Sequence, residues 1–321
     1  MEKPYVFITR KLPEEVVAPF REQLNIRMWE SEFEPVDRNL LKKEAKQANG
    51  LLTMLTDQVD EELLIDAAHL RIVANMAVGF DNIDVENAKK HKVIVTNTPD
   101  VLTDTTADLA FGLLMATARR IVEAADFIKE GEWGQWSPFL LAGSDIHHKK
   151  LGIVGMGRIG EAVAKRAQGF DMEVSYHNRS RKKDVEKELS IQYENLDDLL
   201  RSSDFIMCLV PLTKETKHLF NEESFKKMKK SATFINVSRG ATVDEHALYE
   251  ALISKEIKGA GLDVFEKEPI SSSHPLLSLE QVICLPHIGS ASIETRQKMI
   301  QLSLDNLSRV LHGDSAITPI N

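Results

Sequence analysis

Three polar residues of complementary chemistry each follow a short apolar, β-rich run of the sequence. Arg239 comes after TFINVS, Glu268 comes shortly after GAGLDVF, and His287 comes after VICLP. In an open α/β sheet, ligands bind beyond the carboxyl ends of the strands, so we expect these side chains to lie near one another. An arginine holds anionic groups and polarises carbonyls, and a histidine beside a carboxylate donates protons near neutral pH. The three residues are therefore the candidate catalytic set.

The segment LGIVGMGRIGEAVAKRA contains glycines in the spacing G-x-G-x-x-G. Gly155, Gly157 and Gly160 stand directly after a predicted strand and at the start of a predicted helix. Gly155 permits a tight turn, Gly157 lets the backbone approach a pyrophosphate, and Gly160 allows the helix to pack closely on the strand. The N–H groups at the helix N-terminus then face the phosphates. The spacing alone is weak evidence, but its place between a strand and a helix predicts dinucleotide binding.

The loop after the second strand of this unit indicates which dinucleotide is bound. It reads YHNRSRKK at 176–183, with no Asp or Glu where an enzyme specific for NADH places one on the ribose 2′-hydroxyl. An acid there would repel a 2′-phosphate, whereas Arg179 and Ser180 offer it a guanidinium fork and a hydroxyl. We predict NADPH in preference to NADH, and the alternative interpretation is a solvated basic loop.

A dinucleotide site and the candidate catalytic set together define a reaction. Hydride addition to the carbonyl of a keto acid needs a cation for the carboxylate and a proton donor for the developing alkoxide. Arg239 and His287 are suited to these roles, and Glu268 would hydrogen-bond the imidazole and favour its charged form. Considered alone, a histidine near a strand end is more often structural than catalytic, and a glutamate in such a loop is an ordinary charged residue. Their joint position after the glycine segment predicts an oxidoreductase that acts on 2-keto acids.

The elements that must position these residues form two series. In the first, β-rich runs alternate with segments of helical period, at Tyr5–Ile8, Ile26–Trp29, Leu51–Leu55, Ile72–Met76 and Val93–Val95. The turn NTPD at 97–100 ends that series, and one long helix is predicted from about residue 103 to 129. The second series begins at Leu151, with strands predicted near 151–154, 173–177, 204–209, 233–237, 259–263 and 282–284. Each series predicts a doubly wound parallel sheet of the α/β class.

The last helical segment, 291–311, has no predicted strand after it. We expect it to pack back on the first series, which would make that domain discontinuous. The predicted boundaries are 1–99 plus 290–321 for one domain and 100–289 for the other.

Composition limits the class of protein. A chain of 321 residues with 43% hydrophobic residues can bury the cores of two domains. A net charge of −9 without a basic stripe argues against nucleic acid as a partner. The longest apolar stretch, 109–118, is shorter than the roughly 20 residues of a bilayer span, so no membrane association is expected. The opening segment MEKPYVFITR lacks the features of a signal peptide.

Two further residue types bear on the compartment and on metals. Cys208 and Cys284 lie in apolar, strand-like runs and are expected to be reduced core thiols, which is consistent with the cytoplasm. The adjacent His147 and His148 have no other ligand nearby in sequence, and no metal site is expected.

The chain resembles the D-2-hydroxyacid dehydrogenase family over essentially its whole length. The resemblance rests on GMGRIG at 155–160 together with AVGFDNID at 77–84, NTPDVLTDTTADLAFGL at 97–113, CLVPLTKET at 208–216, NVSRGATVDE at 236–245, GAGLDVFEKEP at 259–269 and PHIGSAS at 286–292. The sequence departs slightly at Ala77, where Gly is commoner. The resemblance implies a flavodoxin-like substrate domain over 1–99 plus 290–321 and a Rossmann NAD(P)-binding domain over 100–289, with the cleft between them.

The resemblance also implies roles for single residues. In the family, the arginine, glutamate and histidine of these segments have the roles given above to the candidate catalytic set. The N–H groups of Val78 and Gly79 would hold the substrate carboxylate, and Leu55 would line the substrate pocket. Trp136 resembles a residue that reaches the active site of the partner subunit. A homodimer is implied, with residues 103–145 as its contact region.

Cofactor contacts are implied for further residues within or beside the signature segments. They are Thr106, Met156, Arg158, Ile159, Asn178, Val210, Pro211, Thr216, Val237, Ser238, Asp263, Gly289 and Ser290.

Among subfamilies, the chain is most similar to glyoxylate/hydroxypyruvate reductases, including those acting on 2-ketogluconate. The NRSR loop, the WSP segment and the lack of a C-terminal regulatory extension carry this resemblance. Two alternatives stay open, a nucleotide-sensing binding protein of the same fold and a dehydrogenase of the formate or phosphite type. The candidate catalytic set argues against the first alternative, and the NADPH-type loop argues against the second.

Overall fold

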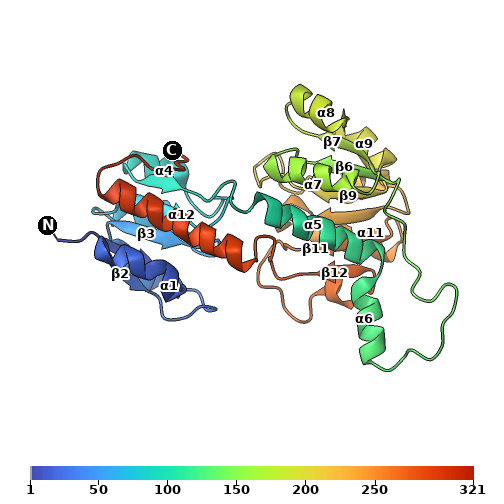
Figure 1. Ribbon diagram of the computed structural model, residues 1–321, viewed down its shortest axis with the longest axis horizontal. Coiled ribbons are helices and arrows are strands. Elements are labelled where there is room, and N and C mark those ends of the chain that lie inside the picture. The colour runs from blue at the N-terminus through green and yellow to red at the C-terminus, as the bar shows by residue number, and fades with distance from the viewer. Residues whose placement is uncertain (1) are drawn as a thin grey trace. The chain divides into compact units, whose positions relative to one another are not determined.

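The computed structural model describes residues 2–321 and divides them into two compact units (Figure 1). One unit extends to Leu102 and includes Ala291–Asn321, and the other is Thr103–Ser290. Each unit is built on a parallel β-sheet, which confirms the predicted α/β class with two parallel sheets.

The first unit contains a five-stranded sheet in the order β2-β1-β3-β4-β5. Its strands are β1 (Tyr5–Ile8), β2 (Asn25–Met28), β3 (Gly50–Thr53), β4 (Ile72–Asn75) and β5 (Ile94–Thr96). Every residue of β3 and β4 is buried, as expected for central strands covered by helices on both faces. The strand order reverses beside β1, and the loops after β1 and β3 therefore flank the point at which such sheets bind ligands.

Short helices connect these strands. They are α1 (Glu14–Val17), the 3-10 helix η1 (Ala18–Glu22), α2 (Arg38–Ala45), α3 (Glu61–Ile65) and α4 (Val85–Lys90). Helices α2, α3 and α4 each begin after an aspartate, Asp37, Asp60 and Asp84, whose side chain accepts backbone N–H groups of the first turn. These N-caps satisfy donors that a helix cannot pair internally.

The C-terminal helix α12 (Ile293–Leu311) packs against β3 and β4 of the first unit (Figure 1). Gly50 allows this close approach, because a Cβ there would lie 2.6 Å from Cδ2 of Leu307. The Arg71 guanidinium donates hydrogen bonds to the carbonyls at the end of α12. The chain then returns to β5, where the Ile320 N–H donates to the carbonyl of Val95 over 2.8 Å.

The second unit contains a seven-stranded parallel sheet in the order β12-β11-β10-β9-β6-β7-β8. Its strands are β6 (Lys150–Val154), β7 (Glu173–His177), β8 (Gln192–Tyr193), β9 (Phe205–Cys208), β10 (Thr233–Asn236), β11 (Gly259–Leu262) and β12 (Val282–Cys284). The strand order reverses between β6 and β9. Only β8 was not predicted, because a two-residue edge strand is too short to show a period.

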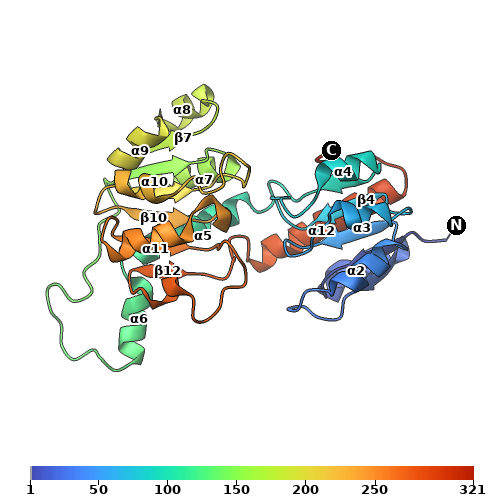
Figure 2. The same cartoon turned by 180° about the vertical axis from the view of Figure 1, so that it is seen from behind.

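Helices cover both faces of this sheet (Figure 2). Besides α5 (Thr103–Ala118) and α7 (Arg158–Gln168) on one face, the unit contains α6 (Ile121–Lys129), α8 (Lys183–Leu189), α9 (Leu196–Ser202), α10 (Glu222–Lys227), α11 (Glu245–Ile253), η2 (Gly240–Thr242) and η3 (Pro275–Ser278). Two hydrophobic cores lie on the two faces of this sheet, and alternate residues of β9 pack into them. Phe205 and Met207 join the core beneath α5 and α7, whereas Ile206 and Cys208 join the core beneath α9, α10 and α11.

The single helix predicted over residues 103–129 is wrong, because the structure has two helices there. Helix α5 ends at Ala118, and α6 begins after Arg120, whose backbone is left-handed with φ 54°. The carbonyl of Ala118 accepts the N–H of Ser144 instead of a helical donor. Gly143 lies against the same carbonyl, since a Cβ on it would be 2.3 Å from the oxygen. A tertiary contact thus ends the helix, and the hydrophobic periodicity of the sequence does not reveal such a contact.

The cysteines are unpaired but not equally buried. Cys208 is buried, as predicted, whereas Cys284 is only half-buried and is not a core thiol. The reason is that β12 forms the edge of the sheet, and all its residues are partly exposed. Within residues 2–321, no helix is both long enough and apolar enough to cross a membrane.

Candidate active site

His287 and Glu268 are hydrogen-bonded to each other in the second unit, in the segments that follow β12 and β11. The imidazole Nδ1 lies 2.7 Å from Oε2 of Glu268. The other carboxylate oxygen, Oε1, accepts the backbone N–H of Phe265 over 2.9 Å. The backbone of His287 is left-handed, with φ 54°, which is uncommon for a residue with a side chain. Because Nδ1 faces the carboxylate, Nε2 is the ring nitrogen that Glu268 leaves for other partners.

Asp263 holds the backbone of the segment that contains His287. Its two carboxylate oxygens accept the N–H groups of Ile288 and Gly289, each over 2.8 Å. Burial raises the pKa of Asp263 above its ordinary value, although these N–H groups and the charge of His287 act in the opposite direction. Asp263, which was predicted as a cofactor contact, therefore also organises the loop that contains His287.

Arg239 lies at the end of β10, beside the segment that leads to Glu268. Its charge acts on the Glu268 carboxylate, and its Nη1 donates to the carbonyl of Ser238 over 2.9 Å. The adjacent Gly240 touches the backbone after β11, since a Cβ on it would lie 1.8 Å from the carbonyl carbon of Phe265. Only glycine allows the two backbones to approach this closely. The structure thus brings all three residues of the candidate catalytic set to one edge of one sheet.

The environment keeps the Glu268 carboxylate ionised. Burial is the largest single influence and would raise its pKa, but the hydrogen bond and charge of His287, the Phe265 N–H and the charge of Arg239 together outweigh burial. The pKa of Glu268 is consequently lowered. An ionised carboxylate at hydrogen-bond distance accepts a proton-bearing Nδ1 and so orients the imidazole, with Nε2 directed away from Glu268.

The glycine turn between β6 and α7 has the geometry that a dinucleotide requires. Gly155 has φ 108°, and a Cβ on it would lie 2.6 Å from the backbone of Leu209. A Cβ on Gly160 would lie 2.5 Å from the carbonyl oxygen of Gly155, whereas one on Gly157 would meet nothing within 4 Å. The first and third glycines serve packing, and Gly157 borders open space at the switch point of the sheet. No side chain caps α7 at Gly157, so the turn and the helix N-terminus fit a pyrophosphate.

Several predicted cofactor residues bind one another. Oδ1 of Asn178 accepts the N–H of Met156 over 2.9 Å, so that this N–H is already used within the protein. Oγ1 of Thr216 donates to the carbonyl of Pro211 over 2.6 Å. These bonds shape the loops after β6, β7 and β9 at the carboxyl edge of the sheet.

A second group of predicted cofactor residues gathers around Gly289. A Cβ at that position would lie 3.2 Å from Asp263, 3.4 Å from Thr106 and 3.5 Å from Val237. Arg158 and Ile159 open α7, Val210 lies against Gly155, Ser238 donates to Asn236, and Ser290 closes the unit.

The basic loop after β7 contains cations of two kinds. Arg181 makes a two-pronged contact with Glu186, and Nζ of Lys182 lies 2.6 Å from Glu161. Arg179 makes no hydrogen bond or ion pair with any of residues 2–321, its charge helps to lower the pKa of Glu215, and both it and Ser180 are exposed. The interpretation as a solvated structural loop therefore accounts for Arg181 and Lys182 and leaves Arg179 to be explained.

The predicted carboxylate site lies in the first unit, after β4. The carbonyl of Val78 accepts from Asn97 over 2.8 Å, and the carbonyl of Gly79 accepts from Asn75 over 2.9 Å. Among the described residues, no acceptor binds the N–H groups of Val78 and Gly79. Leu55 is half-buried in the loop after β3.

The structure does not bring Trp136 to the candidate catalytic set of its own chain. It lies in the segment after α6 with 79% of its surface exposed. Within residues 2–321, no hydrogen bond, ion pair or ring contact connects it to those three residues.

Sequence reasoning missed a group of polar residues behind Glu268, namely Glu245, Glu266, His218 and His274. Glu245 directly follows Asp244, the N-cap of α11. It therefore looks like an ordinary acid of a first helical turn, and no sequence signal distinguishes it.

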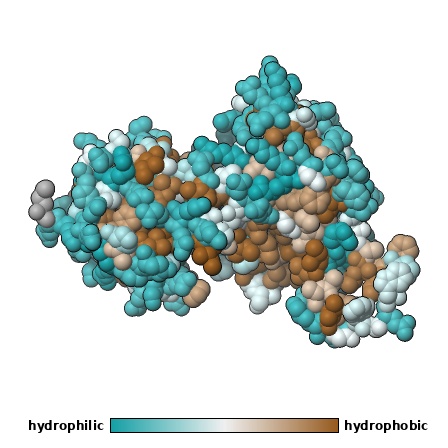
Figure 3. Space-filling view, in the orientation of Figure 1, coloured by the Kyte–Doolittle hydropathy of each residue, from teal (hydrophilic) through white to brown (hydrophobic). Residues whose placement is uncertain are grey.

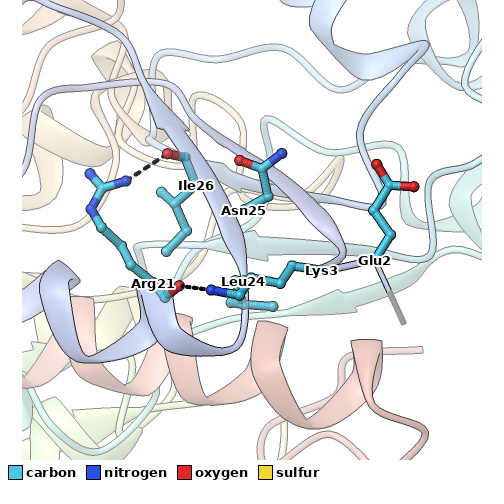
Figure 4. A pocket seen from close by; sticks show the side chains of 6 residues that line it. All are labelled: Glu2, Lys3, Arg21, Leu24, Asn25 and Ile26. Atoms are coloured by element: carbon cyan, nitrogen blue, oxygen red, sulfur yellow. Dashed lines mark hydrogen bonds between the residues drawn. The ribbon is translucent and has the colours of Figure 1, made fainter.

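A hollow of about 370 Å³ lies elsewhere, at the amino ends of β1 and β2 (Figure 4). Its polar groups bind each other, since Nζ of Lys3 donates to the carbonyl of Arg21, and Arg21 donates to the carbonyl of Ile26. It lies at the edge of the first sheet opposite to Leu55 and Val78, and no predicted site residue lines it.

Parallel sheets whose strand order reverses beside a glycine turn are typical of dinucleotide-dependent dehydrogenases. Residues 111–289 match the family described as D-isomer specific 2-hydroxyacid dehydrogenase, NAD binding domain. The chain belongs to this family, which confirms the resemblance inferred from the motifs, and it is an oxidoreductase.

Similar proteins share nearly the whole chain. A glyoxylate reductase of Pyrococcus horikoshii is 49% identical over 323 residues, covering 99% of this chain and 96% of its own. A glyoxylate reductase of Korarchaeum cryptofilum is 48% identical, covering 97% and 94%. Among solved structures, an NADPH-dependent glyoxylate/hydroxypyruvate reductase from Sinorhizobium meliloti in complex with NADP and malonate is 34% identical, covering 99% and 97% with a TM-score of 0.89.

Proposed function

We propose that the protein reduces small 2-keto acids to D-2-hydroxy acids with NADPH. Glyoxylate is the first candidate substrate, followed by hydroxypyruvate and 2-ketogluconate. The observation that carries the proposal is the His287–Glu268 pair, 2.7 Å apart, beside Arg239 at the carboxyl edge of a dinucleotide-binding sheet. The names of the similar proteins support glyoxylate.

In the proposed reaction, each residue of the candidate catalytic set has one task. The bound nicotinamide cofactor supplies the hydride that the keto carbon accepts. Arg239 holds the substrate and polarises its carbonyl, which stabilises the negative charge that develops on oxygen. His287 donates the proton to that oxygen, and Glu268 favours the charged imidazole before the transfer.

We assign the substrate carboxylate to the N–H groups of Val78 and Gly79 and the pocket wall to Leu55. The support is that both N–H groups lack an acceptor within residues 2–321, while side chains occupy both carbonyls. Neighbouring N–H groups are suited to anions.

We assign the NADPH preference to Arg179 and Ser180. Arg179 makes no hydrogen bond or ion pair within residues 2–321, although its charge acts on Glu215, and a guanidinium suits a phosphate better than a carboxylate side chain does. The similar reductase from Sinorhizobium meliloti was solved with NADP. A reductive cofactor and two unpaired cysteines also favour the cytoplasm.

Steady-state oxidation of NADPH and of NADH, measured with glyoxylate, hydroxypyruvate and 2-ketogluconate, tests the proposal. We expect turnover with all three substrates or a subset, and a higher kcat/KM for NADPH. Equal or better efficiency with NADH would refute the cofactor preference. Binding of NADPH without turnover of any keto acid would favour a sensor, and turnover of formate without turnover of glyoxylate would favour the second alternative.

We also propose that the protein is a homodimer through α6 and the segment that follows it. No side chain of α6 is buried, and Ile121, Ile128, Trp136 and Phe139 are exposed, the last by 86%. Figure 3 shows apolar residues gathered over this part of the second unit. Burial of such a surface against a second copy is favourable. Sedimentation velocity should give a dimer, and Ile128→Asp should dissociate it, whereas a monomeric wild-type protein at micromolar concentration contradicts the proposal.

A further inference from the structure

Glu245 binds two points of the segment that contains Glu268. Oε1 of Glu245 accepts the backbone N–H of Glu266 over 2.7 Å. Oε2 lies 3.3 Å from Nε2 of His274. Glu245 is the first residue of α11, and its side chain and that of His274 are each only 19% exposed. One carboxylate thus closes the segment 266–274 into a loop.

Other contacts make this loop the support of the catalytic carboxylate. Phe265 is buried and donates its N–H to Oε1 of Glu268, and the Phe265 ring lies 5.9 Å from the ring of His274. The Glu266 side chain pairs with His218. The backbone N–H groups of two successive residues are therefore bound by two different glutamates, that of Glu266 by Glu245 and that of Phe265 by Glu268.

His274 depends on Glu245 for its polar contact. Its Nδ1 is buried and has no hydrogen-bond partner among residues 2–321, so Nε2 makes the contact that the structure gives this ring. A bond from the ring to a carboxylate requires the proton on Nε2. Without the Glu245 carboxylate, both ring nitrogens would be unpaired, which is costly for a mostly buried ring.

We propose that Glu245 is a positioning residue for the proposed reaction. By holding Glu266 and His274, it fixes the loop in the conformation in which Glu268 meets His287. It does not contact His287 itself and acts through Glu268. The inference rests on the proposed function, because it concerns the orientation of the proton donor.

The test compares the variants Glu245→Ala and Glu245→Gln with Glu250→Ala in the full-length protein. Glu250 is a matched control, since it is an exposed glutamate of the same helix without a side-chain partner within residues 2–321. Glu245→Ala should lower kcat for keto-acid reduction by about tenfold or more, because misplacement by a fraction of an ångström is costly in catalysis. The KM for NADPH should stay within about twofold. Glu245→Gln retains an acceptor for the Glu266 N–H and should recover most of kcat, and Glu250→Ala should match the wild-type protein.

Amide hydrogen exchange tests the positioning separately from the reaction. In Glu245→Ala, the Glu266 amide should exchange faster, and the Phe265 amide should follow because Glu268 is displaced. Faster exchange at Glu266 alone, with wild-type kcat, would overturn the inference. So would a Glu245→Gln variant that is as impaired as Glu245→Ala. If the wild-type protein reduces no keto acid, the proposed function fails, whereas faster exchange at both amides would still support the positioning role.

Discussion

Replacement of Gly240 by alanine should separate the two backbones that carry Arg239 and Glu268. A Cβ on Gly240 would lie 1.8 Å from the carbonyl carbon of Phe265 and 2.0 Å from its oxygen. Ordinary contact begins at 3.4 Å, so one segment must move by 3.4 − 1.8, or roughly 1.6 Å. Misplacement by about 1 Å costs about 100-fold in rate, which corresponds to about 2.7 kcal/mol of transition-state stabilisation. We expect kcat/KM to fall by at least that factor and stability to fall by about 1–3 kcal/mol.

The assay is steady-state reduction of glyoxylate, with NADPH binding and thermal unfolding measured in parallel. The affinity for NADPH should fall less than kcat/KM does, since the glycine turn stays in place and only the predicted contacts Val237 and Ser238 lie in the segment of Gly240. Gly112→Ala is the matched control, because a Cβ there meets nothing within 4 Å and alanine is favourable within α5. A folded Gly240→Ala protein with kcat/KM within about threefold of the Gly112→Ala control would refute the reasoning.

Other changes have expected outcomes of their own. Glu268→Gln removes the carboxylate that lies 2.7 Å from Nδ1 of His287, so we expect kcat/KM to begin to fall at a lower pH, and an unmoved pH profile would contradict the pairing. The folded-state pKa of Glu268 is lowered, so its stabilising contribution is present at neutral pH and is lost as the pH falls through that pKa. In denaturant titrations, the wild-type protein should therefore lose more stability between about pH 6 and pH 3 than the Glu268→Gln variant does. Burial raises the pKa of the Cys284 thiol to about 11, and the charge of Glu245 adds to this effect. Iodoacetamide at pH 8 should therefore react with Cys284 about 100-fold more slowly than with an ordinary thiol. Rapid labelling of Cys284 would argue against that environment. Arg179→Ala should raise the KM for NADPH about tenfold and leave the KM for NADH nearly unchanged. Arg181→Ala removes a guanidinium that is already paired with Glu186 and should have a smaller effect. Similar losses in both variants would indicate a general basic loop.

Local patterns were sufficient for most of the elements. The strand β1 was predicted over the residues it occupies, and the others of the first unit were placed within two residues at each end. Parallel strands are buried on both faces and therefore read as apolar runs, which is a strong local signal. The failures were β8, which is too short to have a period, and the break at Arg120, which depends on Ser144 far along the chain.

The candidate catalytic set depends on the topology of the sheet and not on a local pattern. Arg239, Glu268 and His287 are far apart in sequence, and they were grouped because parallel topology brings the carboxyl ends of strands to one edge. The structure joins His287 to Glu268 and places Arg239 close by. Their catalytic roles and the contacts of the cofactor stay predictions.

The residue types of this chain are enough to indicate its class, its dinucleotide turn and its candidate catalytic set, because each of these depends on short segments with a characteristic pattern. The folded structure alone reveals how the set is supported. Gly240 lies against Phe265, Asp263 binds the backbone beside His287, and Glu245 closes the loop of Glu268. Such contacts join residues separated by 20 or more positions, and their energies depend on distances that no periodicity in the sequence encodes.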